Sequence, residues 1–325
     1  MARTPSITDV TGILVGHYTS AERPTGCTVV TSEKRFVAGV DIRGGAPGTR
    51  ESDLLRAENS VDRIDAVFLS GGSAFGLEVG TGISRYLEEH RRGFDAQIAR
   101  VPIVCGAILF DLLLGNSRIR PDAQAGYDAI RTASRKPVSE GNVGAGAGAT
   151  VGKIFGAENA MKGGLGSWAF THSSGLSVGA LAAVNSMGNV VDPSTGQTIA
   201  GSRSKNRKGF VSASRRIQKS FSLDLPFATS TVLGVVATNA VLSKTQCTKV
   251  AQMAQDALAR CIYPSHMPWD GDTVFAISSG TWKQRKKMDV GILGALAADA
   301  LAKAIVRGVM KAESWGKFPA AKDYP

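Results

Sequence analysis

Residues 226–240 read PFATSTVLGVVATNA and join a cluster of hydroxyl residues to an apolar run. The cluster is Thr229–Thr231, and the β-branched run Val232–Thr238 follows it directly. Such a run predicts a buried strand. The strand therefore begins at potential nucleophiles, and its neighbours in the fold determine what those hydroxyls can do.

Strand-like and helical segments alternate on either side of this stretch, with several consecutive strands in the middle of the chain. This order predicts a layered α/β or α+β domain whose sheet is buried between helices. We expect strands at 27–32, 36–45, 65–72, 101–112, 174–192 and 272–280, a turn at 192–196, and helices at 73–93 (with Ser73 as N-cap), 122–134, 244–261 and 289–311.

Composition narrows the class of protein. The chain has 325 residues and a net charge of +11, and seven of its Lys and Arg residues, with no acid, fall in residues 202–219. That segment is either a solvated, flexible connection or a polyanion contact, and no nucleic-acid-binding motif accompanies it. The N-terminus lacks a signal-peptide pattern and no long apolar run occurs, so we expect a cytoplasmic protein without membrane or nucleic-acid partners.

Cysteine and histidine spacing argues against a metal site. The four cysteines are scattered without a C-x-x-C pair, which is typical of a reduced compartment. The histidines show no metal-ligand spacing. We therefore expect neither a metal nor a cofactor.

Residues 141–153, GNVGAGAGATVGK, fail as a phosphate-binding loop. A Walker A motif needs a first glycine where Ala147 stands and a hydroxyl where Ile154 stands. The alternating glycines instead predict a strand that another backbone approaches closely, with Lys153 at its end. Lys153 is either a surface residue or an ammonium aimed at a pocket.

Three further polar residues follow or precede strands. Asn185 ends the apolar run ALAAVN and is either a turn former or an amide donor to an oxyanion. Asp270 and Asp272 flank a glycine before a strand, as a simple turn or as a charge pair that orients an amine. His266 lies nearby, but without a G-x-S-x-G elbow a Ser/His/Asp triad is disfavoured.

Thr231 has a polar strand edge as its plain interpretation and a nucleophile as its sharper one. If the chain is cut before Thr231, the new α-amine is a base within reach of its own Oγ1. An unperturbed α-amine titrates at roughly 7.7–8.0, which suits a general base.

Several segments together resemble the DmpA-like peptidases, which comprise L-aminopeptidase/D-amidase-esterases, β-aminopeptidases and nylon-oligomer hydrolases. They occur in order from about residue 10 to 300 and include RPTGCTVV, DIRGGAPGTRE, FLSGGSAFGLE, VPIVCGAILFDL, GNVGAGAGATVGK, VGALAAVNSMGNV, TSTVLGVVATNA and PSHMPWDGDTVFA. The resemblance implies a four-layer αββα sandwich like that of N-terminal nucleophile hydrolases. It also implies one hydrolase domain over 1–325 that cuts itself into 1–230 and 231–325 and forms a homo-oligomer of such αβ units.

The resemblance also implies roles for the residues singled out above. Thr231 matches the nucleophile, and Lys153 and Asn185 match positions that stabilise the oxyanion or assist the cut. Asp270 and Asp272 match an acidic or polar pair beside the nucleophile.

Two positions depart from the family pattern. Ser230 precedes the cut where Gly or Asn is typical, and Phe110 stands at a substrate-contacting position where some members carry Tyr.

The implied activity is hydrolysis of peptide, amino-acid amide or ω-amino-acid oligomer bonds through an acyl-enzyme. Two alternatives remain open at this point. One is acyl transfer by the same nucleophile, as in ornithine acetyltransferases, and the other is a non-enzymatic glycine-rich module that binds nucleotide or nucleic acid.

Overall fold

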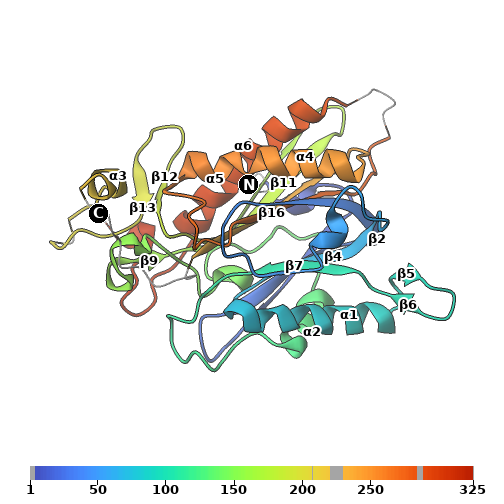
Figure 1. Ribbon diagram of the computed structural model, residues 1–325, viewed down its shortest axis with the longest axis horizontal. Helices are drawn as coiled ribbons and strands as arrows, with labels where there is room; N and C mark the ends of the chain where they lie inside the picture. Colours follow the sequence, from blue (N-terminus) through green and yellow to red (C-terminus); the bar gives the residue numbers. More distant parts are fainter. Residues whose placement is uncertain (1–3, 207, 220–229, 284–287, 325) are drawn as a thin grey trace.

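Two facing β-sheets lie between two groups of helices in the computed structural model, which describes residues 4–206, 208–219, 230–283 and 288–324 (Figure 1). Helices α1 (Val79–Glu89) and α2 (Ala123–Arg131) cover one outer face. Helices α4 (Lys244–Ala254) and α6 (Val290–Met310) cover the other. The predicted four-layer αββα sandwich is thus confirmed.

A single long strand joins the two sheets. β2 (Gly26–Ile42) pairs through its first part with β4 and through its last part with β16. The strand order is β10-β11-β14-β16-β2-β4-β7-β3, and β1 pairs with β2. The bounds of the other strands in this path are β1 (Ile13–Thr19), β3 (Thr49–Arg50), β4 (Ile64–Ser70), β7 (Val104–Ile108), β10 (Gly164–Thr171), β11 (Ser177–Asn185), β14 (Thr231–Thr238) and β16 (Thr273–Ser278).

Alternation along β14 explains why the sequence adopts this layering. Leu233 and Val235 pack between the sheets, whereas Val232 and Val236 pack against the helices of the outer layer. Successive side chains of a strand point to opposite faces, so a strand covered on both sides is apolar at every position. By the same alternation, the side chain of Thr231 lies on the inter-sheet side, at the end of the strand.

Capping confirms the predicted starts of two helices. Asp122 accepts the Ala125 N–H at the start of α2, and Asp289 accepts the Gly291 N–H at 2.7 Å at the start of α6. Asx residues at this position satisfy N–H groups that have no intrahelical partner.

Two details of the predicted helices were wrong. Ser73 is not the N-cap of α1, because a 3-10 turn (Ser73–Glu78) precedes that helix. The predicted helix 244–261 is interrupted at Gln255, whose carbonyl accepts from Leu258, three residues on, and α5 (Asp256–Cys261) continues from there.

The glycine-rich segment and the basic segment also differ in part from expectation. Gly144–Gly146 form a 3-10 turn and not a strand, yet the expected close approach is present, because a Cβ on Gly146 would lie 2.1 Å from the Leu165 nitrogen. The segment 202–219 contains the short helix α3 (Ala213–Ile217), so it is not wholly an irregular connection. Residue 207 and the stretch 220–229 lie outside the described residues.

Two short strand pairs and a small three-stranded sheet complete the fold. The bounds are β5 (Phe94–Asp95) with β6 (Arg100–Val101), β8 (Thr150–Val151) with β9 (Met161–Lys162), and β12 (Asn189–Val191) with β13 (Thr198–Ala200) and β15 (Ile262–Tyr263). Within the described part of the chain, no helix combines the length and apolarity that a membrane span requires.

Candidate active site

The start of β14 is where the predicted site residues meet. Thr231 Oγ1 donates to the Ser230 carbonyl oxygen at 2.6 Å, and the Gly271 N–H donates to the same oxygen at 3.1 Å. Both Ser230 and Thr231 are buried. Two donors on one carbonyl polarise it, which makes this carbonyl a suitable electrophile.

Gly271 packs closely against the side chain of Thr231. A Cβ at this position would lie 2.6 Å from Thr231 Oγ1 and 3.0 Å from the Ala46 carbonyl oxygen. Real Cβ atoms do not approach this closely, so only glycine fits beside the hydroxyl. The D-G turn predicted from the sequence is therefore also a wall of the site.

Asp272 accepts a hydrogen bond from the backbone of Val232, the residue that follows Thr231. Its Oδ1 accepts the Val232 N–H at 2.8 Å, and its Oδ2 accepts the His266 Nδ1 at 2.9 Å and the His266 N–H at 3.2 Å. Asp272 is 3% exposed. The carboxylate thus connects the loop before β16 to the beginning of β14.

Asp270 is adjacent to the same bond but is paired differently. It forms a parallel bridge with Ser230, and its Oδ2 accepts the Met267 N–H at 2.9 Å. Burial, followed by the nearby Asp272 carboxylate, raises the pKa of Asp270 to about 7. A carboxyl that changes protonation near neutral pH is able to exchange a proton or hold an ammonium.

Lys153 contacts the candidate site through Asn185. It follows β8, is 4% exposed, and its Nζ donates to Asn185 Oδ1 at 2.9 Å and to the carbonyls of Thr150 and Asn185 at 3.0 and 3.1 Å. Burial lowers the pKa of Lys153 to about 7, although the Asp270 carboxylate acts in the opposite direction. Lys153 is therefore an interior amine and not a surface residue.

Asn185 lies directly opposite Thr231 in the antiparallel pair of β11 and β14. Its Oδ1 accepts from Lys153 and from the Thr150 N–H at 3.0 Å. Its Nδ2 donates to the Phe110 carbonyl at 3.0 Å, so in this arrangement the amide is part of a network and not a free donor. Phe110 joins the site through this backbone contact.

Unpaired polar atoms gather in this region. Among the described residues, the buried side-chain atoms without a hydrogen-bond partner include Ser230 Oγ, His266 Nε2, Trp269 Nε1 and Asp270 Oδ1. Buried polar atoms are nearly always paired in proteins, and exceptions often mark functional sites. No group of three or more His, Cys, Asp or Glu side chains within the described ranges is arranged to hold a metal.

Sequence reasoning missed three contributors. The sequence pattern indicates no more than a turn glycine at Gly271, and it suggests His266 only as a member of a triad. Lys162, a lysine inside the apolar segment AMKGGLG, was not singled out at all, although its apolar flanks were a signal of burial.

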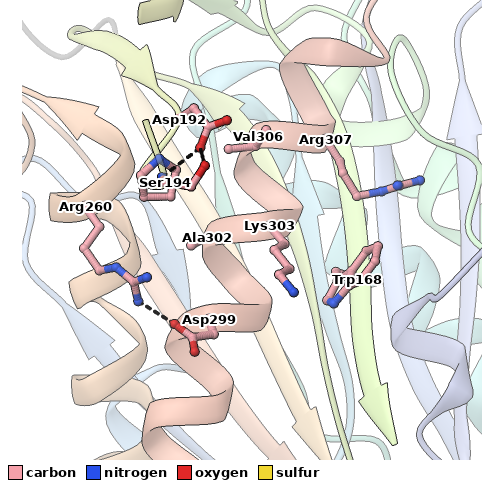
Figure 2. Close-up of a pocket in the computed structure, with 10 residues that line it drawn as sticks. Trp168, Asp192, Ser194, Arg260, Asp299, Ala302, Lys303, Val306 and Arg307 are labelled. Atoms are coloured by element: carbon pink, nitrogen blue, oxygen red, sulfur yellow. Dashed lines mark hydrogen bonds and ion pairs between the residues drawn. The ribbon is translucent and has the colours of Figure 1, made fainter. Parts of the chain in front are cut away.

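A separate hollow lies away from these residues. A cavity of about 430 Å³ runs along α6 beside β10 and is lined by Trp168, Lys303 and Arg307, among others (Figure 2). Its Arg260 is paired with Asp299 at 2.6 Å. None of the predicted site residues lines it, and its charged groups are mostly exposed, so the candidate active site stays at the start of β14.

The profile of peptidase family S58 matches residues 5–320, nearly the whole chain. The chain belongs to peptidase family S58. It is 41% identical to an uncharacterized aminopeptidase of Mycobacterium tuberculosis over 98% of this chain and 97% of that protein. It is 27% identical to the 6-aminohexanoate-oligomer endohydrolase of Paenarthrobacter ureafaciens over 92% of this chain and 84% of that protein.

Solved structures share the fold of this S58 chain. A Burkholderia sp. β-aminopeptidase superimposes with a TM-score of 0.70 at 21% identity, covering 96% of this chain and 88% of that one. The L-aminopeptidase D-Ala-esterase/amidase of Ochrobactrum anthropi, described as a variant of the Ntn hydrolase fold, gives 0.69 at 18% identity and covers 98% and 90%. The family and the names of the relatives support a hydrolase of the peptidase and amidase kind.

Proposed function

We propose that this S58 chain cuts itself between Ser230 and Thr231 and then hydrolyses amide bonds with Thr231 as an N-terminal nucleophile. The observation that carries the proposal is the contact of Thr231 Oγ1 with the Ser230 carbonyl, which Gly271 also binds. The proposed nucleophile and an N–H donor for the developing oxyanion thus both contact the carbonyl group that is to be attacked.

The first stage is an acyl shift within the chain. Thr231 Oγ1 attacks the Ser230 carbonyl carbon, and the Gly271 N–H stabilises the oxyanion. The C–N bond then breaks as the proton lost from Oγ1 is transferred to the Thr231 nitrogen, which leaves an ester between Ser230 and Oγ1. Water then hydrolyses the ester, leaving a carboxylate on Ser230 and a free amine on Thr231. One oxyanion donor typically contributes about 10²–10³ in rate.

The second stage uses the amine that the cut exposes. The α-amine of Thr231 accepts the proton of Oγ1, and Oγ1 attacks the carbonyl carbon of a substrate amide. The resulting ammonium gives this proton to the leaving amine as the C–N bond breaks, and water then hydrolyses the acyl-enzyme ester, which releases the acid and restores the Oγ1 hydroxyl. Lys153 is the proposed donor to the oxyanion. Asn185, whose amide is bound to Lys153 and to Phe110, is proposed to assist by holding Lys153 and the start of β14 in position. Asp270 and Asp272 hold the new ammonium, since both carboxyls lie in the turn beside the strand start.

Amino-group-bearing amides are the proposed substrates: peptides, amino-acid amides and ω-amino-acid oligomers. The names of the relatives support this class, because they include aminopeptidases and a 6-aminohexanoate-oligomer endohydrolase. Phe110, whose backbone binds Asn185, is proposed to contact the substrate. A homo-oligomer of αβ units and a cytoplasmic location stay predictions.

The test compares the wild-type chain with Thr231→Ala on amino-acid p-nitroanilides and on 6-aminohexanoate oligomers. The wild type is expected to release amine from at least one class, and the variant from none. Thr231→Ser, which keeps a hydroxyl, is the matched control and is expected to retain activity. Hydrolysis by Thr231→Ala at the wild-type rate would refute the assignment. Acetyl transfer from acetylornithine to glutamate, without net hydrolysis, would identify an acyltransferase instead.

A further inference from the structure

Lys162 is a second interior lysine near the site. It lies on β9, directly opposite Thr150 of β8, and its side chain is fully buried. Its Nζ donates to the carbonyls of Ala147 and Ala149 at 2.8 and 2.9 Å. Burial of an ammonium costs several kcal/mol, and lysines are almost never fully buried without a partner. A methionine would fill the same space without this cost, so we expect the charge or the N–H donors of Lys162 to have a role.

The loop that Lys162 holds leads straight into the site. Thr150, one residue after Ala149, donates its N–H to Asn185 Oδ1 and offers its carbonyl to Lys153 Nζ at 3.0 Å. The two lysines thus bind three carbonyls of one segment. Lys162 binds those of Ala147 and Ala149, and Lys153 binds that of Thr150. Displacing the loop would displace the contacts of both Lys153 and Asn185.

The charge of Lys162 also acts on Lys153. Burial is the main cause that lowers the pKa of each lysine to about 7, and for Lys153 the charge of Lys162 acts in the same direction. Two carboxyls act against this, Asp270 from the loop before β16 and Asp111 from the segment after β7. Asp111 is itself paired with Arg23 at 2.7 Å, which reduces its effect on the lysines.

We propose that Lys162 is a positioning residue of this active site, which holds the 147–150 loop against Asn185 and, through its positive charge, makes the Lys153 ammonium a stronger proton donor. A more acidic ammonium forms a stronger hydrogen bond to an oxyanion, which fits the role proposed for Lys153. The inference rests on the proposed function, because the oxyanion that Lys153 supports forms during the cut before Thr231.

The first test does not depend on that cut. In the Thr231→Ala chain with ¹³Cε-labelled lysine, the NMR titration of Lys153 is followed with and without Lys162→Gln, which removes the charge and keeps a donor for the carbonyls. The midpoint of Lys153, assigned by its loss in Lys153→Met, is expected to rise by roughly one pH unit, the shift that one nearby charge produces. An unchanged midpoint overturns the proposal.

The second test separates charge from position through the rate of self-cleavage as a function of pH. Lys162→Gln is expected to move the half-maximal rate to higher pH. Lys162→Met, which also loses the donors to Ala147 and Ala149, is expected to lower the maximal rate as well by about tenfold or more. Lys34→Met, at an exposed position, is the control and is expected to change neither.

The outcomes for the two proposals are distinguishable. A wild-type chain that never cuts refutes the proposed function, while the NMR midpoint still reports on Lys162. A chain that cuts normally in both Lys162 variants, with an unshifted pH profile, refutes the role of Lys162 alone. If Lys162→Met fails to fold, the comparison of the wild type with Lys162→Gln still decides the electrostatic part.

Discussion

Gly271 packs against Thr231 so closely that a single added methyl group would lie 2.6 Å from Thr231 Oγ1. The register of β14 and β16, which run parallel with Leu233 opposite Thr273, brings this glycine to the strand start. The contact explains how the hydroxyl is held beside the carbonyl it is proposed to attack.

Gly271→Ala is therefore expected to slow self-cleavage by about 10² or more, because displacement of a reacting atom by about 1 Å has costs of that size. The rate of fragment appearance on a gel measures it. Gly291→Ala is the control: Gly291 is exposed at the start of α6, and its Cβ would meet only the Asp289 carboxylate, at 3.0 Å. Equal rates in both variants would show that the contact is unimportant.

Asp272→Ala is expected to destabilise the uncut Thr231→Ala chain by about 1–3 kcal/mol, because it leaves the buried Val232 N–H without its acceptor. In the chain that keeps Thr231, the same change is expected to slow the cut. Urea unfolding and cleavage rates measure the two effects. Asp272→Asn keeps an acceptor for the Val232 N–H, so its free energy of unfolding is expected to fall less than that of Asp272→Ala. A larger fall for Asp272→Asn than for Asp272→Ala would contradict the role given to this hydrogen bond.

Asp270 is expected to make stability fall as the pH rises from about 4 to about 7. The folded chain holds the Asp270 proton up to about pH 7, because burial and then Asp272 raise its pKa. An unfolded aspartate loses its proton near roughly pH 4, so the folded state binds more protons in this window.

Asp270→Asn removes that titration and keeps an acceptor for Met267. The free energy of unfolding is measured in the uncut Thr231→Ala background, with and without Asp270→Asn. The value for the Asn variant minus that for its parent should increase by up to about 1.4 kcal/mol per pH unit between pH 4 and 7. The difference should level off above pH 7. A difference that is flat with pH would show that Asp270 ionises normally in the folded chain.

The layered fold was predictable because its strands and helices are marked locally. The structure keeps the features that local sequence indicates. These are the apolar strands, the helix caps Asp122 and Asp289, and the turn closed by the hydrogen bond from the Gly196 N–H to the Asp192 carbonyl. The interruption at Gln255 had no such signal, since the residue keeps helical backbone angles and only the hydrogen-bond spacing changes.

The site was predictable as a set of residues and not as a set of contacts. The resemblance marked Thr231, Lys153 and Asn185, and the structure brings them together. The side chain of Asn185 faces Lys153 and Phe110, an orientation that depends on the packing of β7, β8 and β11 and on no local pattern.

Contacts that cross the fold explain what the sequence did not reveal. His266 reaches Asp272 because the loop before β16 folds back on itself, and Lys162 reaches Ala147 across the β8–β9 pair. Neither spacing matches a known motif.

The most direct test of the central claim is the intact mass of the purified protein, beside that of Thr231→Ala, followed by N-terminal sequencing of any fragment. A cut before Thr231 divides the 325 residues into 230 and 325 − 230 = 95. The account predicts both fragments in the wild type, a new N-terminus that begins TVLGV, and one unbroken chain in the variant. A wild-type chain that stays whole while hydrolysing amino-acid amides would contradict it, because no α-amine would then exist on Thr231 to act as the base.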